Sequence, residues 1–340
     1  FNNIEFTNTA GTSRIYYNNN YGNLIINKAV FKSHGQLQGN FTFNDLVFSK
    51  GKTYELEAQQ TQTIINSLTA IGTCNLTINI KSLTSGSQAN ISKSSGNVIV
   101  EYVALRDINA TGGATFIANN SVDVSNNSGW TINTSAPIDL YWVGGTGNWD
   151  DSTHWSTISG GFGGACVPTV NDNVFFDANS FTGSAQSVNI NTNAFCNNIN
   201  WTGAMYNPTF TGTNTYTLNI YGSLVFINNM NLSFQGRTNF EATTLGKTIT
   251  SAGKQFVSNV YFQGAGGGWT LLDPFSTSNT IYLYHGTLNT NSQNVSANSF
   301  NSSASNPATR SLILGSTTLT LTSTSSSAWS VYNDNFTLDA

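Results

Sequence analysis

The sequence predicts an all-β protein that coils as a right-handed parallel β-helix, with units in tandem. Three observations predict this fold. Short stretches along the whole chain alternate apolar with polar residues, helical spacing of apolar residues is almost absent, and one strand phrase recurs. Alternation with a period of two is typical of a strand with one buried face. Tandem β-sandwich domains are the alternative arrangement of such strands.

The recurring phrase has an aromatic residue, then Asn or Asp two positions later, an aliphatic residue and a second aromatic residue. It is complete at Phe1–Phe6 and Phe43–Phe48, and its central part returns at Asn198–Trp201 and Asn259–Gly264. A strand phrase that recurs without helical segments between its copies favours one rung shape stacked many times. We therefore expect Phe6, Phe48 and Phe262 to point inward and to stack in the core.

Other alternating stretches are separated by turn residues. They occupy residues 24–26, 75–80, 98–103, 216–220, 311–314 and 319–322. The chain has 31 glycines but only 5 prolines, so its turns rely on Gly and Asn, which tolerate left-handed conformations. We also expect Asn in a turn to hydrogen-bond to the Asn of the next rung, as in an amide ladder. Two-residue Asn-Gly and Asp-Gly hairpins are few, which favours the β-helix over sandwiches.

One domain boundary is clear. We interpret residues 1–135 as the C-terminal part of one β-helix repeat unit, residues 136–140 as a linker, and residues 141–340 as the N-terminal and middle part of the next unit. The segment 128–132 closes the first block, and an aromatic, glycine-rich string opens the second. The chain begins inside a strand phrase and ends without a stop signal, so we expect a fragment or a processed chain of a larger protein.

The composition argues against several classes of protein. Only 8% of the 340 residues are charged, against roughly a quarter in a typical soluble domain. The 39% hydrophobic fraction argues against a disordered tract, because that much apolar surface can offset the entropy of ordering. A net charge of −4 without a large basic patch argues against a nucleic-acid partner. The chain has no run of about 18 apolar residues that would predict a membrane-spanning helix. An uncharged polar coat is typical of secreted β-rich surface proteins.

The three cysteines predict a disulfide and no metal site. Cys74, Cys166 and Cys196 form no CxxC motif and no Cys/His cluster, which argues against structural zinc. Cys166 and Cys196 flank a predicted strand–turn–strand segment and are the structural disulfide candidate. Such a bridge would stabilise the fold by roughly 3–4 kcal/mol on the loop-entropy model. The alternative is that both are small buried apolar residues, and Cys74 is then unpaired or pairs outside this fragment.

The polar residues do not predict an enzyme. His34, His154 and His285 have no nucleophile in a recognisable motif, and the 16 acids are dispersed, so we expect no catalytic residue. We expect His154 to make a capping or hydrogen-bonding contact. Asp172 and Asp177 are expected to bind turn backbone. They are also weak candidates for calcium, the one cofactor that the chain suggests, because carboxylate oxygens are hard ligands.

Three tryptophans lie at the start of the second block. Trp142, Trp149 and Trp155 follow one another at intervals of seven and six residues. A solenoid end exposes apolar area and strand edges, so bulky rings are expected to cover it. The alternative is that the three rings are exposed and stack on the apolar faces of sugars as glycan contacts.

Several strings of the chain resemble a known family. They are Tyr141–Trp155, 159–169, 171–181, 112–116, 126–130 and 310–316. In combination these strings are similar to the units of the giant SprB-type gliding-motility adhesins of the Bacteroidota. The string at 141–181 resembles a unit opening, the strings at 112–130 a unit closing, and that at 310–316 a rung within a unit.

The resemblance implies a repetitive stalk or filament segment of an adhesin that acts in gliding motility and surface attachment. It implies export by the type IX secretion system and an extracellular location on the cell surface, attached to the outer membrane. The implied partners are neighbouring repeat units of the same chain, surface polysaccharide or the substratum, and the outer-membrane gliding and secretion machinery. The alternative function is a carbohydrate-binding or polysaccharide-degrading β-helix protein.

Overall fold

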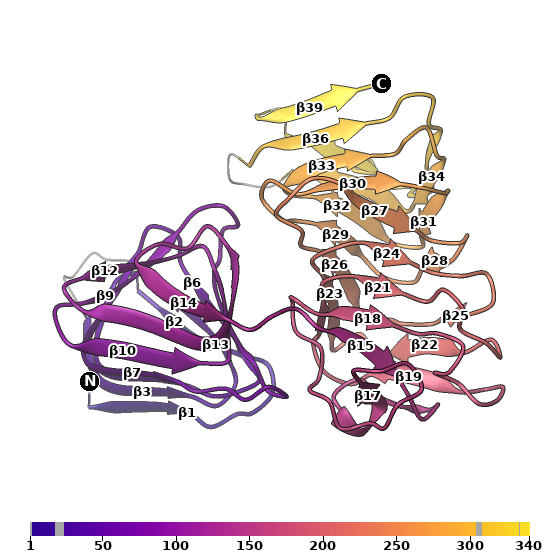
Figure 1. Ribbon diagram of the computed structural model, residues 1–340. Helices are drawn as coiled ribbons and strands as arrows, with labels where there is room; N and C mark the ends of the chain where they lie inside the picture. The colour runs from indigo at the N-terminus through magenta and orange to yellow at the C-terminus, as the bar shows by residue number, and fades with distance from the viewer. Residues whose placement is uncertain (1, 18–23, 304–307, 333) are drawn as a thin grey trace. The chain divides into compact units, whose positions relative to one another are not determined.

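The protein is nearly all β, and its strands form a right-handed parallel β-solenoid of about 15 turns. The computed structural model describes residues 2–17, 24–303, 308–332 and 334–340. The chain divides into two compact units, Phe1–Ala136 and Pro137–Ala340, so the division falls at the start of the segment predicted as a linker. Among the strand pairs of the described residues only β15 with β17 is antiparallel, which excludes the alternative of antiparallel sandwiches. Figure 1 shows the two stacks of strands.

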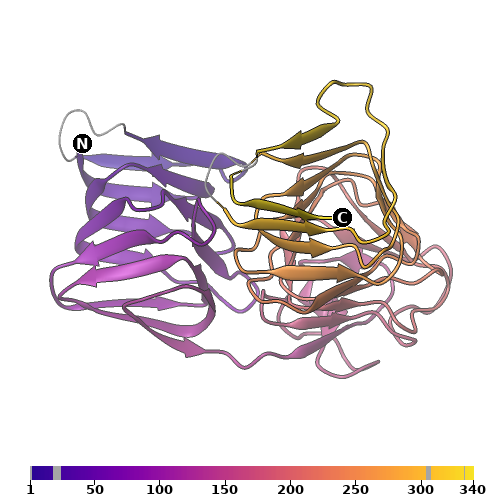
Figure 2. The same cartoon turned by 90° about the horizontal axis from the view of Figure 1, so that it is seen from above.

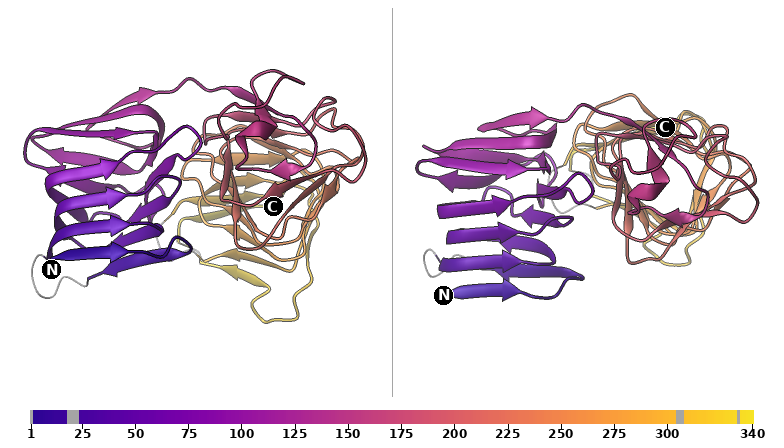
Figure 3. Two further views of the ribbon diagram at one scale, coloured as in Figure 1. Left: turned by 90° about the horizontal axis from the view of Figure 1, so that it is seen from below. Right: turned by 60° about the horizontal axis from the view of Figure 1, so that its bottom comes forward.

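The first unit is built from two parallel sheets. One sheet has the order β1 (Asn3–Phe6), β3 (Leu24–Phe31), β5 (Phe41–Phe48), β7 (Thr61–Ala70), β9 (Ala89–Lys93) and β12 (Ile108–Gly112). The other has the order β10 (Asn97–Glu101), β13 (Thr115–Ser125), β11 (Val103–Arg106), β8 (Ile78–Ser82), β6 (Thr53–Leu56), β4 (His34–Gln38) and β2 (Thr12–Tyr16), and β14 (Trp130–Thr134) also pairs with β13. Figure 3 shows the strands of the first of these sheets side by side.

The second unit has three strands in most turns, and each strand position forms its own face. The first face has the order β17 (Trp155–Ser156), β15 (Asp139–Trp142), β18 (Asn173–Phe175), β21 (Ile199–Asn200), β24 (Leu224–Val225), β27 (Lys247–Thr250), β30 (Gly268–Leu271), β33 (Gly286–Asn289), β36 (Arg310–Ile313) and β39 (Phe336–Asp339). A single 3₁₀ turn, η1 (Ser152–His154), precedes β17. Figure 2 shows the turns of this unit from above.

The other two faces of the second unit follow the same sequence order. The second strand positions are β16 (Gly147–Asn148), β19 (Ser187–Ile190), β22 (Thr209–Gly212) and β25 (Asn231–Leu232), then β28 (Gln255–Phe256), β31 (Phe275–Thr277), β34 (Val295–Ala297) and β37 (Leu319–Leu321). The third face has the order β20 (Ala194–Cys196), β23 (Thr217–Ile220), β26 (Arg237–Phe240), β29 (Val260–Phe262), β32 (Thr280–Leu283), β35 (Ser299–Ser302) and β38 (Trp329–Val331).

The expected stacking of phenylalanines in the core is confirmed. Phe6 pairs in register with Phe31, and Phe31 with Phe48, with ring centroids 4.6 and 6.0 Å apart. The complete copies of the recurring phrase are therefore two strands apart on one sheet and in register. In the second unit Phe262 stacks on Phe240 at 5.0 Å. The partial copies lie on different faces, on β21 and β29, so the phrase marks an inward-facing strand rather than one position in the turn.

Amide ladders connect successive rungs, but they lie along strands and not in turns as expected: Asn3, Asn27 and Asn44 belong to β1, β3 and β5. In the second unit the Asn173 amide donates to Asp139 at 2.8 Å, and the Asn198 amide donates to Asn173 at 2.7 Å. In the first unit the Asn27 amide donates to Asn3, and the Asn44 amide donates to Asn27. These bonds join residues far apart in the sequence but adjacent along the solenoid axis, so they add to the backbone bonds of the parallel sheets.

Buried polar side chains stabilise two irregular places in the first unit. Between β5 and β7 the register shifts, and the carbonyls of Ile65 and Asn66 in the resulting bulge accept from the ammonium of Lys93, both at 2.7 Å. Lys93 is only 8% exposed. At the start of β6 the amide N–H of Thr53 donates to Nδ1 of His34 at 2.9 Å. This bond requires a neutral imidazole, because a protonated ring has no acceptor nitrogen.

Candidate functional site

The three tryptophans of the opening string cover the beginning of the second core. Trp142, Trp149 and Trp155 have no exposed surface. The ring of Trp155 lies edge-on to Trp142 and to Trp149, both at 5.0 Å, and its Nε1 donates to the carbonyl of Trp149 at 2.8 Å. The antiparallel pair of β15 and β17 lies at this end of the sheet. A fully buried ring cannot stack on a sugar, so the glycan-contact alternative for these residues is wrong, and their packing fits the covering role.

The polar residues of the same string support this end of the core. The ring of His154 stacks on Trp142 at 4.7 Å with 8° between the planes, and its Nδ1 lies 2.7 Å from the carbonyl oxygen of Val143. The carboxylate of Asp151 caps the 3₁₀ turn, where it accepts from the N–H and the hydroxyl of Thr153. The expected hydrogen-bonding role of His154 is confirmed.

The predicted disulfide between Cys166 and Cys196 is wrong. Cys196 is a free, fully buried thiol at an inward position of β20, opposite Ile220 of the next strand. Burial, with a smaller effect from the carboxylate of Asp172, raises the pKa of the Cys196 thiol, so it stays protonated. The prediction considered spacing along the chain, whereas the inward orientation of Cys196 gives it the role of a small apolar core residue.

The two calcium candidates make hydrogen bonds to protein groups. Asp172 is 6% exposed and accepts from the N–H groups of Ile138 and Thr169 and from the hydroxyl of Thr169. Asp177 accepts from the hydroxyl of Ser159 and from the N–H of Asn179. Within the part of the chain that the structure describes, no group of three or more His, Cys, Asp or Glu side chains could hold a metal ion. Calcium binding at Asp172 and Asp177 stays a prediction.

The outer side of the third face carries a cluster that the sequence analysis missed. Tyr261 and Tyr282 stack at 4.2 Å with 10° between their planes. Tyr284 lies edge-on to both, at 5.7 and 5.3 Å. The guanidinium carbon of Arg237 lies 4.7 Å from the centre of the Tyr261 ring. We call these four residues the tyrosine–arginine cluster.

The register of the third face explains how the cluster forms. Tyr261 and Tyr282 are directly opposite each other on β29 and β32 and belong to a column of outward residues that crosses every strand from β23 to β38. The members of this column are Asn219, Asn239, Tyr261, Tyr282, Asn301 and Ser330. The two aromatic rings therefore interrupt a row of short polar side chains, of which Asn219 and Asn239 are buried. The tyrosines are half-buried, whereas Arg237 is exposed.

Arg237 makes the cluster cationic, and two of its phenols have raised pKa values. Partial burial, together with the neighbouring tyrosines, raises the pKa of Tyr284 to about 12. Partial burial and Tyr282 also raise the pKa of Tyr261, although Arg237 opposes the effect. At neutral pH Tyr261 and Tyr284 therefore keep neutral hydroxyls, each able to donate and to accept, next to the positive charge of Arg237.

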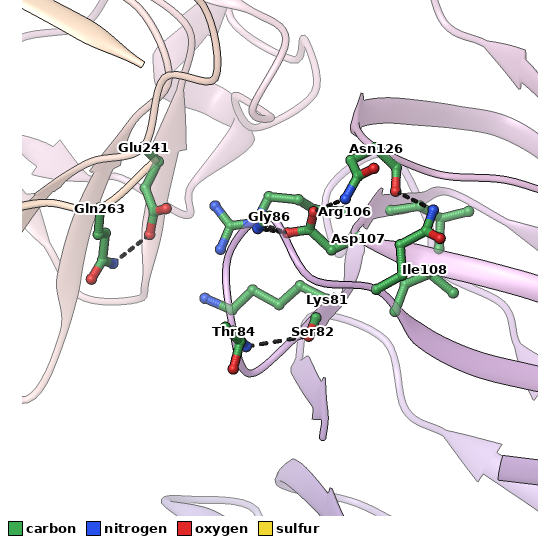
Figure 4. A network of polar contacts seen from close by, with 12 residues as sticks. Lys81, Ser82, Thr84, Gly86, Arg106, Asp107, Ile108, Asn126, Glu241 and Gln263 are labelled. Carbon is green, nitrogen blue, oxygen red and sulfur yellow. Dashed lines mark hydrogen bonds and ion pairs between the residues drawn. The ribbon is translucent and has the colours of Figure 1, made fainter. Parts of the chain in front are cut away.

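Each unit also has a carboxylate that accepts hydrogen bonds from neighbouring turns (Figure 4). On the third face the amide of Gln263 donates to the carboxylate of Glu241 at 2.6 Å. In the first unit the carboxylate of Asp107 accepts from the N–H of Gly86 and from the amide of Asn126. These contacts occupy the carboxylates in hydrogen bonds within each unit.

A sequence signal for the cluster did exist. The outward positions of Val260–Phe262 and Thr280–Leu283 follow from the same alternation that predicts the strands, and they are aromatic where most other outward positions are Asn, Ser or Thr. What the sequence does not give is the register that places Tyr261 against Tyr282.

No protein-family model, no curated protein and no solved structure matches this chain. Among the residues that the structure describes, none of the helical segments has the length and hydrophobicity needed to span a bilayer.

Proposed function

We propose that this chain is a stalk segment of an extracellular surface adhesin that acts in gliding motility and surface attachment. The observation that carries the proposal is the stack of parallel rungs within each unit, with a polar coat that carries few charges. Its support from the sequence is the resemblance of the strings at 141–181 to unit openings of SprB-type adhesins.

The geometry suits a spacer. The first face of the second unit contains nine parallel strands from β15 to β39, which makes eight steps. At about 4.8 Å a step, the stack spans roughly 38 Å along its axis. Each rung contacts only its neighbours, so length can grow by adding rungs without a larger core. Backbone bonds and amide ladders connect each rung to the next.

The surface suits the cell exterior. With 8% charged residues, hydration depends on amides and hydroxyls, whose interactions are insensitive to the ionic strength of the surroundings. In the proposal, neighbouring repeat units of the same chain continue the stack. The type IX secretion and gliding machinery of the outer membrane exports the filament and moves it over surface polysaccharide or the substratum.

Two experiments test the proposal. An antibody against this chain should label intact cells of the source organism, and protease added outside should remove the label. Deletion of the encoding segment should reduce attachment and movement on a surface. Label that appears only after the cells are permeabilised would exclude the surface role.

Single-molecule stretching tests the stalk role separately. The strands pairing Ile199 with Leu224 and Leu224 with Ile249 give rungs of 25 residues. Because an extended residue spans about 3.4 Å, release of one rung should lengthen the chain by roughly 80 Å after the folded step is subtracted. A single all-or-none extension of the whole unit would contradict rung-wise mechanics.

A further inference from the structure

The tyrosine–arginine cluster is unusual for the surface on which it lies. Its neighbours in the outward column, Asn239 before it and Asn301 after it, have short polar side chains. The half-buried tyrosine rings keep part of their apolar surface in water, which is unfavourable unless a ligand covers it. Tyr and Arg are also the residue types that most often dominate binding surfaces, because they combine a large rigid area with hydrogen-bonding groups.

The residues of the cluster are arranged along the solenoid axis. Arg237, Tyr261 and Tyr282 come from β26, β29 and β32, so they follow one another along the solenoid axis. The contact with Tyr261 restrains the guanidinium while the side chain stays exposed. A guanidinium held in this way presents paired N–H groups, which match the two oxygens of a carboxylate.

At the other end of the cluster the side chains become shorter. The residue opposite Tyr282 on β35 is Asn301, whose side chain is much shorter than a tyrosine. Tyr284, directly after the end of β32, lies edge-on to Tyr282 at 5.3 Å. The ring face of Tyr282 that points toward β35 thus has no aromatic partner in register, and the ring of Tyr284 lies edge-on beside Tyr282. A sugar ring combines an apolar face with a rim of hydroxyls, which suits this arrangement.

We infer that the tyrosine–arginine cluster binds an acidic polysaccharide, with the carboxylate of one uronic-acid residue on Arg237 and the apolar face of another sugar on Tyr282. The inference rests on the proposed adhesin role and gives that role a gripping surface. Arg237 and Tyr282 are two strands apart, or about 10 Å along the axis, so the ligand is a polymer that runs along the solenoid rather than a single sugar.

The charge of the second unit narrows the choice of ligand. Residues 137–340 contain four Lys and Arg (Arg237, Lys247, Lys254 and Arg310) and nine Asp and Glu, which gives 4 − 9 = −5. Arg310 is only 1% exposed, so Arg237 is the arginine of this unit that can meet a ligand. This net negative charge repels every polyanion, so the attraction has to come from local contacts at the cluster and not from the charge of the unit as a whole. A carboxylated polysaccharide combines one carboxylate per sugar with the hydroxyls and ring faces that the tyrosines recognise.

Affinity electrophoresis of the full chain tests the inference. Migration is compared in gels that contain polygalacturonate, neutral dextran or polyglutamate, and the apparent Kd follows from retardation against polymer concentration. We expect retardation by polygalacturonate and none by dextran or polyglutamate. Arg237→Gln should weaken binding about tenfold or more, because a charge-assisted bidentate contact is lost. Tyr282→Ala should weaken it similarly through lost stacking. Lys254→Gln removes one charge from the same unit and should leave binding unchanged.

Each other outcome overturns the inference. Equal retardation by polyglutamate, or an equal loss with Lys254→Gln, would show nonspecific charge attraction. Binding that survives both Arg237→Gln and Tyr282→Ala would place the site elsewhere. Circular dichroism and the thermal midpoint of each variant establish that it is folded, and Tyr282→Leu, which also removes the ring, is the milder variant if Tyr282→Ala does not fold. Absence of polysaccharide binding with normal surface labelling of cells would remove this inference and leave the stalk proposal intact.

Discussion

Replacing Trp155 by alanine should open the beginning of the second unit. The side chain is fully buried between Trp142 and Trp149. A buried aromatic side chain removes about 150–250 Å² from water, which at about 25 cal/mol per Å² is worth roughly 4–6 kcal/mol. Measured Trp→Ala substitutions in cores cost about 3–5 kcal/mol. The substitution also removes the hydrogen bond from Nε1 to the carbonyl of Trp149, which adds about 1 kcal/mol. We therefore expect a loss of about 5 kcal/mol.

The loss should be local, because each rung of a solenoid contacts only its neighbours. Hydrogen–deuterium exchange read by mass spectrometry on the full chain measures it peptide by peptide. Peptides that cover β15 to β19 should exchange more than a thousandfold faster, since every 1.4 kcal/mol is about tenfold, whereas peptides that cover β33 to β36 should be unchanged.

Two further variants separate the effect of ring packing at Trp155 from the effect of its position at the beginning of the unit. Trp155→Phe keeps most of the ring packing and loses the N–H group, so its effect should be about 1–2 kcal/mol. Trp269→Ala removes an equally buried ring that packs edge-on to Phe262 within the stack, and its effect should appear around β27 to β33. Unchanged exchange across β15 to β19 in Trp155→Ala would refute the covering role of the tryptophans.

Three other substitutions test local contacts. Burial lowers the pKa of His34, so its neutral form contributes stability that is complete above about pH 6.5 and is lost as pH falls through the lower pKa of the folded state. Urea unfolding at several pH values should therefore show a free energy of unfolding that falls as the pH falls in this range. His34→Gln should reduce this dependence on pH. Lys93→Met should cost about 2 kcal/mol in the same assay, because two carbonyls of the bulge in β7 lose a charged donor, whereas Lys93→Arg should retain part of the stability. Cys196 should resist a thiol reagent in the folded chain and react in urea, and rapid labelling under native conditions would contradict its place in the core.

The alternation of residues was sufficient to predict the strands and the inward phenylalanines. Phe48 and Phe262 occupy inward positions because a strand buries every second side chain whatever its neighbours are. The amide ladders were expected in turns, whereas Asn27 and Asn44 meet on the paired strands β3 and β5. For Trp142, sequence reasoning left two alternatives, and burial decided between them.

The prediction of the disulfide failed because it used spacing along the chain in place of the position of each residue in its turn. Cys166 and Cys196 flank one predicted segment, but the inward parity of β20 buries Cys196 in the core. Asp172 reaches Ile138, 34 residues earlier, because the two belong to adjacent turns. Rungs vary in length, so sequence distance does not determine which residues of two rungs meet.

By itself the sequence determined that the chain is all β, that its rungs stack with their apolar side chains inside, and that its coat is polar and nearly uncharged. These properties follow from alternation and composition, which act locally. Only the tertiary structure decided which outward residues stand together. Tyr261 and Tyr282 are 21 residues apart, and they stack because the loops between β29 and β32 return the chain in that register. Register is set by how a whole turn closes, and no short stretch of sequence encodes it.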